Sequence, residues 1–118
     1  MERTIILQIP LCTNNLLCAR LAASAVCSLL NIDIEETEDV KVSVNEACLM
    51  FMRYNYKKAK LSFIMGNPLT IVIDAEGVCE MHNFKDENEE IGLVLLNSLV
   101  DEVKYERTKE IISQITLY

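Results

Sequence analysis

Residues 59–65 alternate between apolar and polar side chains, and this period of two predicts a strand with one buried face. The side chains that share the buried face are those of Ala59, Leu61, Phe63 and Met65. Gly66-Asn67-Pro68 should form a turn into a second strand over residues 69–73, because glycine and proline interrupt regular structure. A strand is expected at 3–9 from its β-branched residues, and two closing strands are expected at about 103–107 and 110–117, with a turn at Thr108-Lys109.

A spacing of three and four residues replaces the alternation in the acidic segment that precedes these strands, and it predicts a helix. Its buried stripe consists of Val40, Val44, Ala47 and Phe51. Thr37 is expected to cap the helix, with Glu38 and Asp39 in the first turn, where the helix dipole favours negative charge. The helix should end near Asn55.

An alanine-rich segment before this helix predicts another, because alanine favours helix and permits close packing. Thr13 or Asn14 is expected to cap it, and it should run to about Leu30.

The last helix is expected after Asp86 and Glu89, whose spacing fits a capping box, and it should run to about Asp101. Its predicted buried face consists of Ile91, Leu95 and Leu99.

The predicted order of elements is β-α-α-β-β-α-β-β, with strands in hairpin pairs rather than in strict alternation with helices. This order is typical of the α+β class. We expect a two-layer α/β sandwich, with a mixed, mostly antiparallel sheet and three helices on one face. A length of 118 residues fits one domain, residues 1–118.

Charge and composition narrow the function classes. The formal net charge is −7, from 18 acidic and 11 basic residues, and such a field repels the phosphates of nucleic acid. The apolar stretches are too short to span a bilayer, and the beginning of the chain does not resemble a signal peptide. We therefore expect a cytoplasmic protein that binds neither nucleic acid nor membrane, and whose acidity suits solubility or a basic protein partner.

Five cysteines occur at irregular spacing without a C-x-x-C pair, so the sequence predicts no metal site of the zinc type. Cys18, Cys27 and Cys48 fall within apolar helical patterns, and we expect them to be buried as small hydrophobic residues.

The second predicted helix carries Asn45-Glu46-Ala47 after an acidic first turn, and Tyr56-Lys57 follows its end. The strand that ends at Asp74 leads to Gly77, and the third helix begins near Gly92. These motifs resemble those of the bacterial anti-sigma-factor serine kinases, which belong to the histidine-kinase-like, or Bergerat-fold, ATPases. The resemblance covers nearly the whole chain.

The resemblance implies a role for each of five residues. Glu46 would be the catalytic residue that positions a water or the acceptor hydroxyl. Asp74 would accept a hydrogen bond from the adenine amino group of ATP, and Gly77 and Gly92 would let the backbone approach the nucleotide closely. Arg20 on the first helix, together with the edge of the sheet, would contact a protein partner.

The chemistry of the family is incomplete in this chain. The family has an asparagine one turn after the glutamate, where it holds Mg²⁺, and this chain has Met50, whose thioether is a poor ligand for a hard cation. Glu76 stands where the family has its first glycine, so Gly77 is displaced by one position. The segment that would cover ATP is short and acidic, which disfavours phosphate. Without a metal ion, Glu46 could be an ordinary helix charge, and Asp74 could satisfy backbone N–H groups of the following turn.

Three functions remain open from the sequence. The first is an anti-sigma-factor-like regulator that binds a sigma factor, an anti-anti-sigma protein or its own copy, with a degenerate ATP site and no cofactor. The second is an active ATP-dependent serine kinase that uses ATP and Mg²⁺. The third is a dimerisation module without a ligand.

Overall fold

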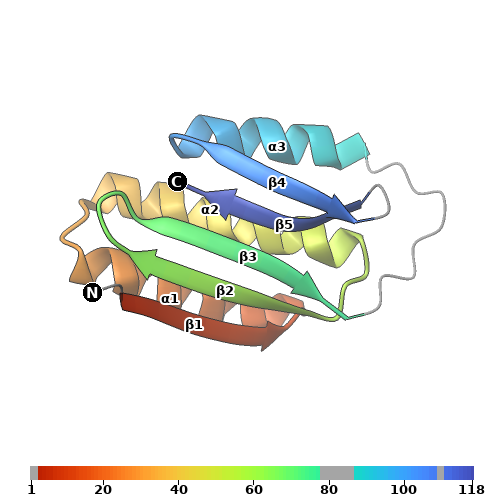
Figure 1. Ribbon diagram of the computed structural model, residues 1–118, viewed down its shortest axis with the longest axis horizontal. Helices are drawn as coiled ribbons and strands as arrows, with labels where there is room; N and C mark the ends of the chain where they lie inside the picture. Colours follow the sequence, from red (N-terminus) through yellow and green to blue (C-terminus); the bar gives the residue numbers. More distant parts are fainter. Residues whose placement is uncertain (1–2, 78–86, 109–110) are drawn as a thin grey trace.

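The computed structural model describes residues 3–77, 87–108 and 111–118, in which three helices cover one face of a five-stranded sheet (Figure 1). The strands are β1 (Arg3–Pro10), β2 (Lys58–Met65), β3 (Thr70–Glu76), β4 (Val103–Thr108) and β5 (Ile111–Leu117). The helices are α1 (Leu16–Leu29), which follows a short 3-10 turn at Thr13–Asn15, α2 (Ile34–Arg53) and α3 (Glu87–Leu99). The predicted α+β sandwich is confirmed.

The strand order across the sheet is β1-β2-β3-β5-β4, and each neighbouring pair in the described residues is antiparallel. The expectation of a mixed sheet is therefore corrected. β3 and β4 run in the same direction, but β5 lies between them and hydrogen-bonds to both. Because β5 lies between β3 and β4, these two strands do not form a parallel pair (Figure 1).

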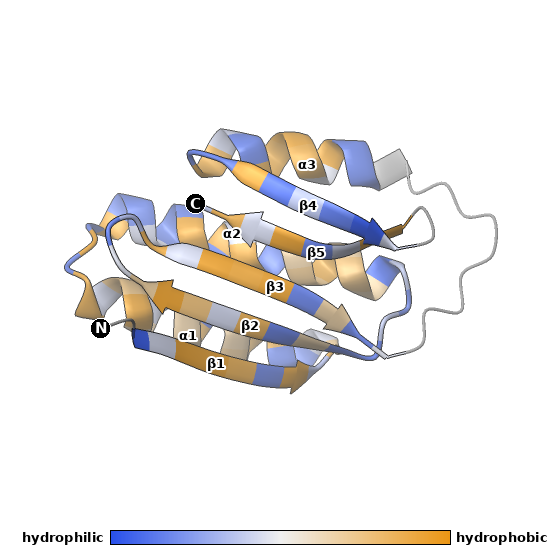
Figure 2. Ribbon diagram, viewed as in Figure 1, coloured by the Kyte–Doolittle hydropathy of each residue, from blue (hydrophilic) through white to orange (hydrophobic). Residues whose placement is uncertain are grey.

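The core lies between the sheet and the helices, and two sequence patterns predicted its main layers. All four residues expected on the buried face of β2 are buried. On α2, Val44, Ala47 and Phe51 are fully buried, while Val40 is half-buried against the same core. β4 at the sheet edge contrasts with these elements, because it is largely hydrophilic beyond Val103 (Figure 2).

The starts of α1 and α2 differ from the sequence prediction. Asp33 rather than Thr37 caps α2, since its Oδ1 accepts a hydrogen bond of 2.8 Å from the Glu36 N–H. Thr37 lies in the first turn of the helix, where its hydroxyl donates to the Asp33 carbonyl oxygen at 2.7 Å. Neither Thr13 nor Asn14 caps α1, because both lie in the 3-10 turn that precedes it. The apolar pattern located both helices, and local hydrogen bonding decided where they begin.

α3 presents a different face to the core than the predicted one. Ile91 and Leu95 are exposed, by 66% and 37%, while Leu96 is fully buried and Gly92 lies against α2. Because Gly92 faces α2, the larger side chains of Ile91 and Leu95 are turned toward solvent. Asp86, half of the predicted capping box, lies outside the described residues.

Two of the three cysteines expected in the core are there. Cys27 and Cys48 are fully buried, whereas Cys18 lies on the outer face of α1 and is exposed. Burial raises the pKa of the Cys48 thiol to about 12 and also raises that of Cys27. Both buried thiols therefore stay protonated at neutral pH.

Candidate functional site

α2 lies between α1 and α3, and adjacent residues of its motif face opposite neighbours (Figure 1). Asn45 faces α1, where its side-chain oxygen accepts a hydrogen bond of 2.7 Å from Arg20 Nη1. Glu46 faces α3. Arg20, which the sequence predicted as a partner contact, is thus tied to the motif within the molecule.

Glu46 is held by an ion pair on its own helix. Its Oε1 lies 3.1 Å from Arg53 Nη2, and the carboxylate side chain is 16% exposed. Sequence reasoning missed Arg53, although a spacing of seven residues places the two side chains on one face of a helix. Met50, one turn after Glu46, is fully buried.

Gly92 brings α3 into direct contact with these two side chains. A Cβ atom at this position would lie 2.8 Å from Glu46 Oε1 and 2.9 Å from Met50 Sδ. Both separations are well inside van der Waals contact, which is about 3.5 Å. The close backbone approach expected at Gly92 is present, and the atoms that it approaches are those of α2. Glu46, Met50 and Gly92 therefore form one packed contact, which we call the helix contact.

Asp74 does not join the helix contact. In the sheet it lies opposite Lys60 and Gln114, and its Oδ1 accepts a hydrogen bond of 2.7 Å from Gln114 Nε2. The buried side chain of Ile73 faces the helices, so its neighbour Asp74 faces the opposite, uncovered side of the sheet. The structure thus separates Asp74 from Glu46 by the thickness of the sheet.

Ala75 takes the helix-facing place at this end of β3. It lies opposite Ala59, which is fully buried, and it packs against the same core. Ala75 also precedes Gly77 by two residues, which is the separation of the aspartate and the first glycine in the motif of the resembling kinases. Ala75, rather than Asp74, thus combines the helix-facing side of β3 with the motif's two-residue spacing to Gly77.

Gly77 has a φ of 94°, a conformation that favours glycine. A Cβ atom there would lie 2.8 Å from Lys57 Cβ, and the Lys57 N–H donates to the Glu76 carbonyl oxygen at 3.1 Å. Close packing against Lys57, which precedes β2, therefore explains why a glycine is required at position 77. Val78 and Cys79, where the sequence lacks a further glycine of the motif, lie outside the described residues, as does the acidic segment up to Asp86.

A second polar cluster connects α2, α3 and β4 and was missed by sequence reasoning. The buried hydroxyl of Tyr54 donates to the Glu89 carboxylate, and Arg107 Nη1 lies 3.1 Å from the same oxygen. The hydrogen bonds to Glu89 raise the pKa of Arg107 above its usual value. The three residues are far apart in the sequence, and only the packing of α3 beside β4 brings them together. This cluster fixes the start of α3, close to Gly92.

The part of the chain that the structure describes contains neither a metal-binding cluster nor a membrane-spanning helix. No group of three or more histidine, cysteine, aspartate or glutamate side chains in residues 3–77, 87–108 and 111–118 could hold a metal ion. No helix in the same part of the chain is long and apolar enough to cross a membrane.

Comparison with known proteins places nearly the whole sandwich in one family. The family model described as "Histidine kinase-like ATPase domain" matches residues 10–117. A comparison with curated proteins finds none that matches this chain. The family match spans all elements except most of β1, which agrees with the fold predicted from the sequence motifs.

Proposed function

We propose that this chain, which belongs to the histidine-kinase-like ATPase domain family, is a regulatory protein of the anti-sigma-factor type that acts by binding another protein. In this proposal its nucleotide site is degenerate. The observation that carries the proposal is the helix contact, because Gly92 lies against Glu46 and Met50 with no space for a ligand between these atoms.

The side chains at the motif positions do not fit Mg²⁺ and ATP. Met50 offers a buried thioether where the resembling kinases have a metal-binding amide oxygen, and Mg²⁺ requires oxygen ligands. Ala75 offers a methyl group where those kinases have the aspartate that accepts from adenine. Glu46 is already paired with Arg53. No catalytic step through a nucleotide is therefore assigned to these residues.

The outer face of α1 supports a role in protein binding. Leu17 and Leu21, one turn apart, are 51% and 58% exposed, and Leu29 is 62% exposed near the end of the helix. The exposed Cys18 and Ala25 continue this apolar stripe. Contiguous exposed apolar surface of this kind marks interaction sites on many proteins. The stripe passes beside Arg20, which the family resemblance associates with partner contact.

Calorimetric titration with Mg-ATP and Mg-ADP tests the nucleotide half of the proposal. We expect no saturable heat up to millimolar nucleotide. Mg²⁺ lacks its oxygen ligand at Met50, and the adenine amino group lacks a carboxylate acceptor at Ala75. Saturable micromolar binding that requires Mg²⁺ would contradict the proposal and favour an active serine kinase.

Co-purification with sigma factors and anti-anti-sigma proteins of the same cell tests the binding half. We expect a stable complex with one of them, and we expect Leu17→Glu with Leu21→Glu to abolish it. Val94→Glu is the matched control, since Val94 is a similarly exposed apolar residue on α3. A chain that forms only dimers of itself and binds none of these proteins would favour a dimerisation module.

A further inference from the structure

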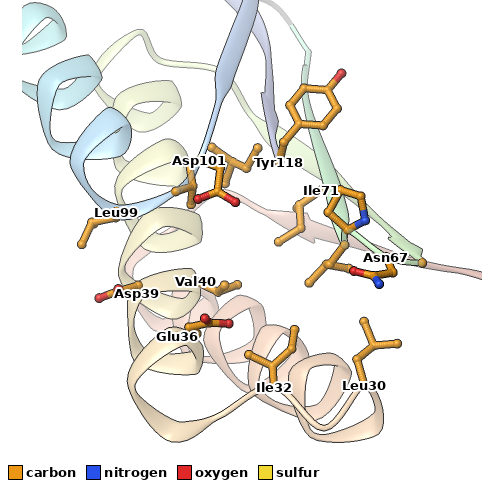
Figure 3. Close-up of a pocket in the computed structure, with 15 residues that line it drawn as sticks. Leu30, Ile32, Glu36, Asp39, Val40, Asn67, Ile71, Leu99, Asp101 and Tyr118 are labelled. Atoms are coloured by element: carbon orange, nitrogen blue, oxygen red, sulfur yellow. The ribbon is translucent and has the colours of Figure 1, made fainter.

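A cavity of about 750 Å³ opens at the end of the molecule where α2 begins (Figure 3). The connection between α1 and α2, the first turns of α2, the turn between β2 and β3, and the ends of α3 and β5 form its walls. Glu36, on its wall, lies fourteen residues before Met50 on the same helix, which corresponds to about 20 Å along the axis. The cavity is therefore distinct from the helix contact.

The floor of the cavity is apolar. Ile71 and Leu117, each 2% exposed, lie at its base, and the half-buried side chains of Val40 and Leu69 extend this surface. An apolar floor of this kind favours the carbon skeleton of a ligand. The volume of the cavity lies within the usual range for small-molecule sites, which is about 300–1,000 Å³.

The rim of the cavity is acidic. Glu36, Asp39 and Asp101 line it, and no lysine or arginine is among the lining residues. Figure 3 shows the side chains of Glu36 and Asp101 directed into the opening. None of the three carboxylates forms an ion pair or accepts a hydrogen bond within the described residues.

Helix orientation adds to this negative potential. α1 and α3 both end at the cavity, and the carbonyl ends of helices carry partial negative charge. α2 begins there and contributes the opposite charge, but the Asp33 carboxylate already caps its first turn. Two helix ends and the carboxylates of Glu36 and Asp101 thus face one helix start, so an anionic ligand is disfavoured and a cation is favoured.

We infer that this cavity binds an organic cation, an ammonium or guanidinium group on an apolar stem, with the stem against Ile71 and Leu117 and the charge beside Glu36 and Asp101. Such a group exists in a free amine or guanidine, and it exists in a lysine or arginine side chain of a protein segment. The inference is independent of the nucleotide site and of the proposed regulatory function.

The test uses the full chain in a titration followed by amide chemical shifts. The probes are phenethylamine, its neutral analogue phenethyl alcohol, and a short end-blocked peptide with one arginine between two leucines. We expect saturable shifts at residues that line the cavity, with the amine bound about tenfold more tightly than the alcohol. Equal affinity for amine and alcohol, or saturation by neither the amine nor the peptide, would overturn the inference.

Two neighbouring substitutions provide the matched control. Glu36→Gln should weaken the binding of the amine by about threefold, as expected for one partly solvated ion pair. Glu35→Gln removes the same charge from the same helical turn, outside the cavity lining, and should leave the affinity unchanged. An equal effect of both substitutions would show a non-specific field effect and would contradict the inference.

The relative affinities of the amine and the peptide identify the source of the cation. Much tighter binding of the peptide assigns the cavity to an arginine or lysine side chain of a protein segment. Comparable or tighter binding of phenethylamine assigns it to a free amine.

Discussion

Gly92 of α3 lies directly against Met50 of α2, since a Cβ atom at Gly92 would lie 2.9 Å from Met50 Sδ. Met50 is fully buried, so its side chain has little room to move aside. The contact explains why α3 turns Gly92 toward α2 and leaves Ile91 and Val94 exposed. It also determines the effect of substitutions at either residue.

Gly92→Ala should lower the free energy of unfolding by about 1 kcal/mol. Overpacking against Glu46 and Met50 costs about 1–3 kcal/mol, and the better helix propensity of alanine offsets about 1 kcal/mol of this. Urea unfolding measures the difference. A stabilised variant would mean that α3 is not in contact with α2 at this position.

A double-mutant cycle tests the same contact from the other side. Met50→Ala alone should cost about 2–5 kcal/mol, because it leaves a cavity in the core. In the double variant with Gly92→Ala, the added methyl group occupies part of that space, so the total loss should be smaller than the sum of the single losses. Strict additivity would contradict the contact.

Tyr54→Phe should destabilise the protein by about 1.5 kcal/mol. The Tyr54 hydroxyl is buried and donates to the Glu89 carboxylate, and hydrogen bonds to carboxylates contribute more than those between neutral groups. Tyr118→Phe is the matched control, and it should change the free energy of unfolding by less than about 0.5 kcal/mol, since Tyr118 follows β5 and is only half-buried. Equal losses in the two variants would count against the Tyr54–Glu89 bond.

The buried Cys48 thiol should make stability fall at alkaline pH. Burial raises its pKa from 9.0 to about 12, so the unfolded chain loses this proton above pH 9 while the folded chain keeps it. The contribution to stability is fully present below pH 9 and decreases toward pH 12, by about 1.4 kcal/mol per pH unit.

Urea unfolding between pH 9 and about pH 10.5 measures this slope. Cys48→Ala should remove the contribution of one proton from this slope, which is about 1.4 kcal/mol per pH unit. Cys18→Ala, at an exposed position, is the control that should leave the slope unchanged. An unchanged slope in Cys48→Ala would show that the thiol titrates in the folded chain.

Asp33→Ala should lower the free energy of unfolding by about 1 kcal/mol, because the Asp33 side chain caps α2. Asp33→Asn should retain most of the stability, since an amide oxygen can accept the same hydrogen bond. Thr37→Ala should cost less than Asp33→Ala, because Thr37 lies within the helix. A larger loss for Thr37→Ala would restore the cap predicted from the sequence.

The candidate site shows where prediction from sequence ends. Glu46 and Gly92 could be identified from motif resemblance, and the structure places them in contact. Asp74 was equally recognisable, yet it faces away from them, and its neighbour Ala75 faces the helices. A shift of one residue in a strand moves a side chain to the other face of the sheet, and only the pairing with β2 decides which face that is.

The sequence by itself determined the element order, the buried faces of β2 and α2, and membership of the family, because each depends on a local period or motif. The tertiary structure decided the rest: the face that α3 buries, the cluster of Tyr54, Glu89 and Arg107, and the acidic cavity at the start of α2. These features join segments that are distant in the chain. Their geometry follows from how helices pack on the sheet and on one another, and a pattern within one segment does not contain that information.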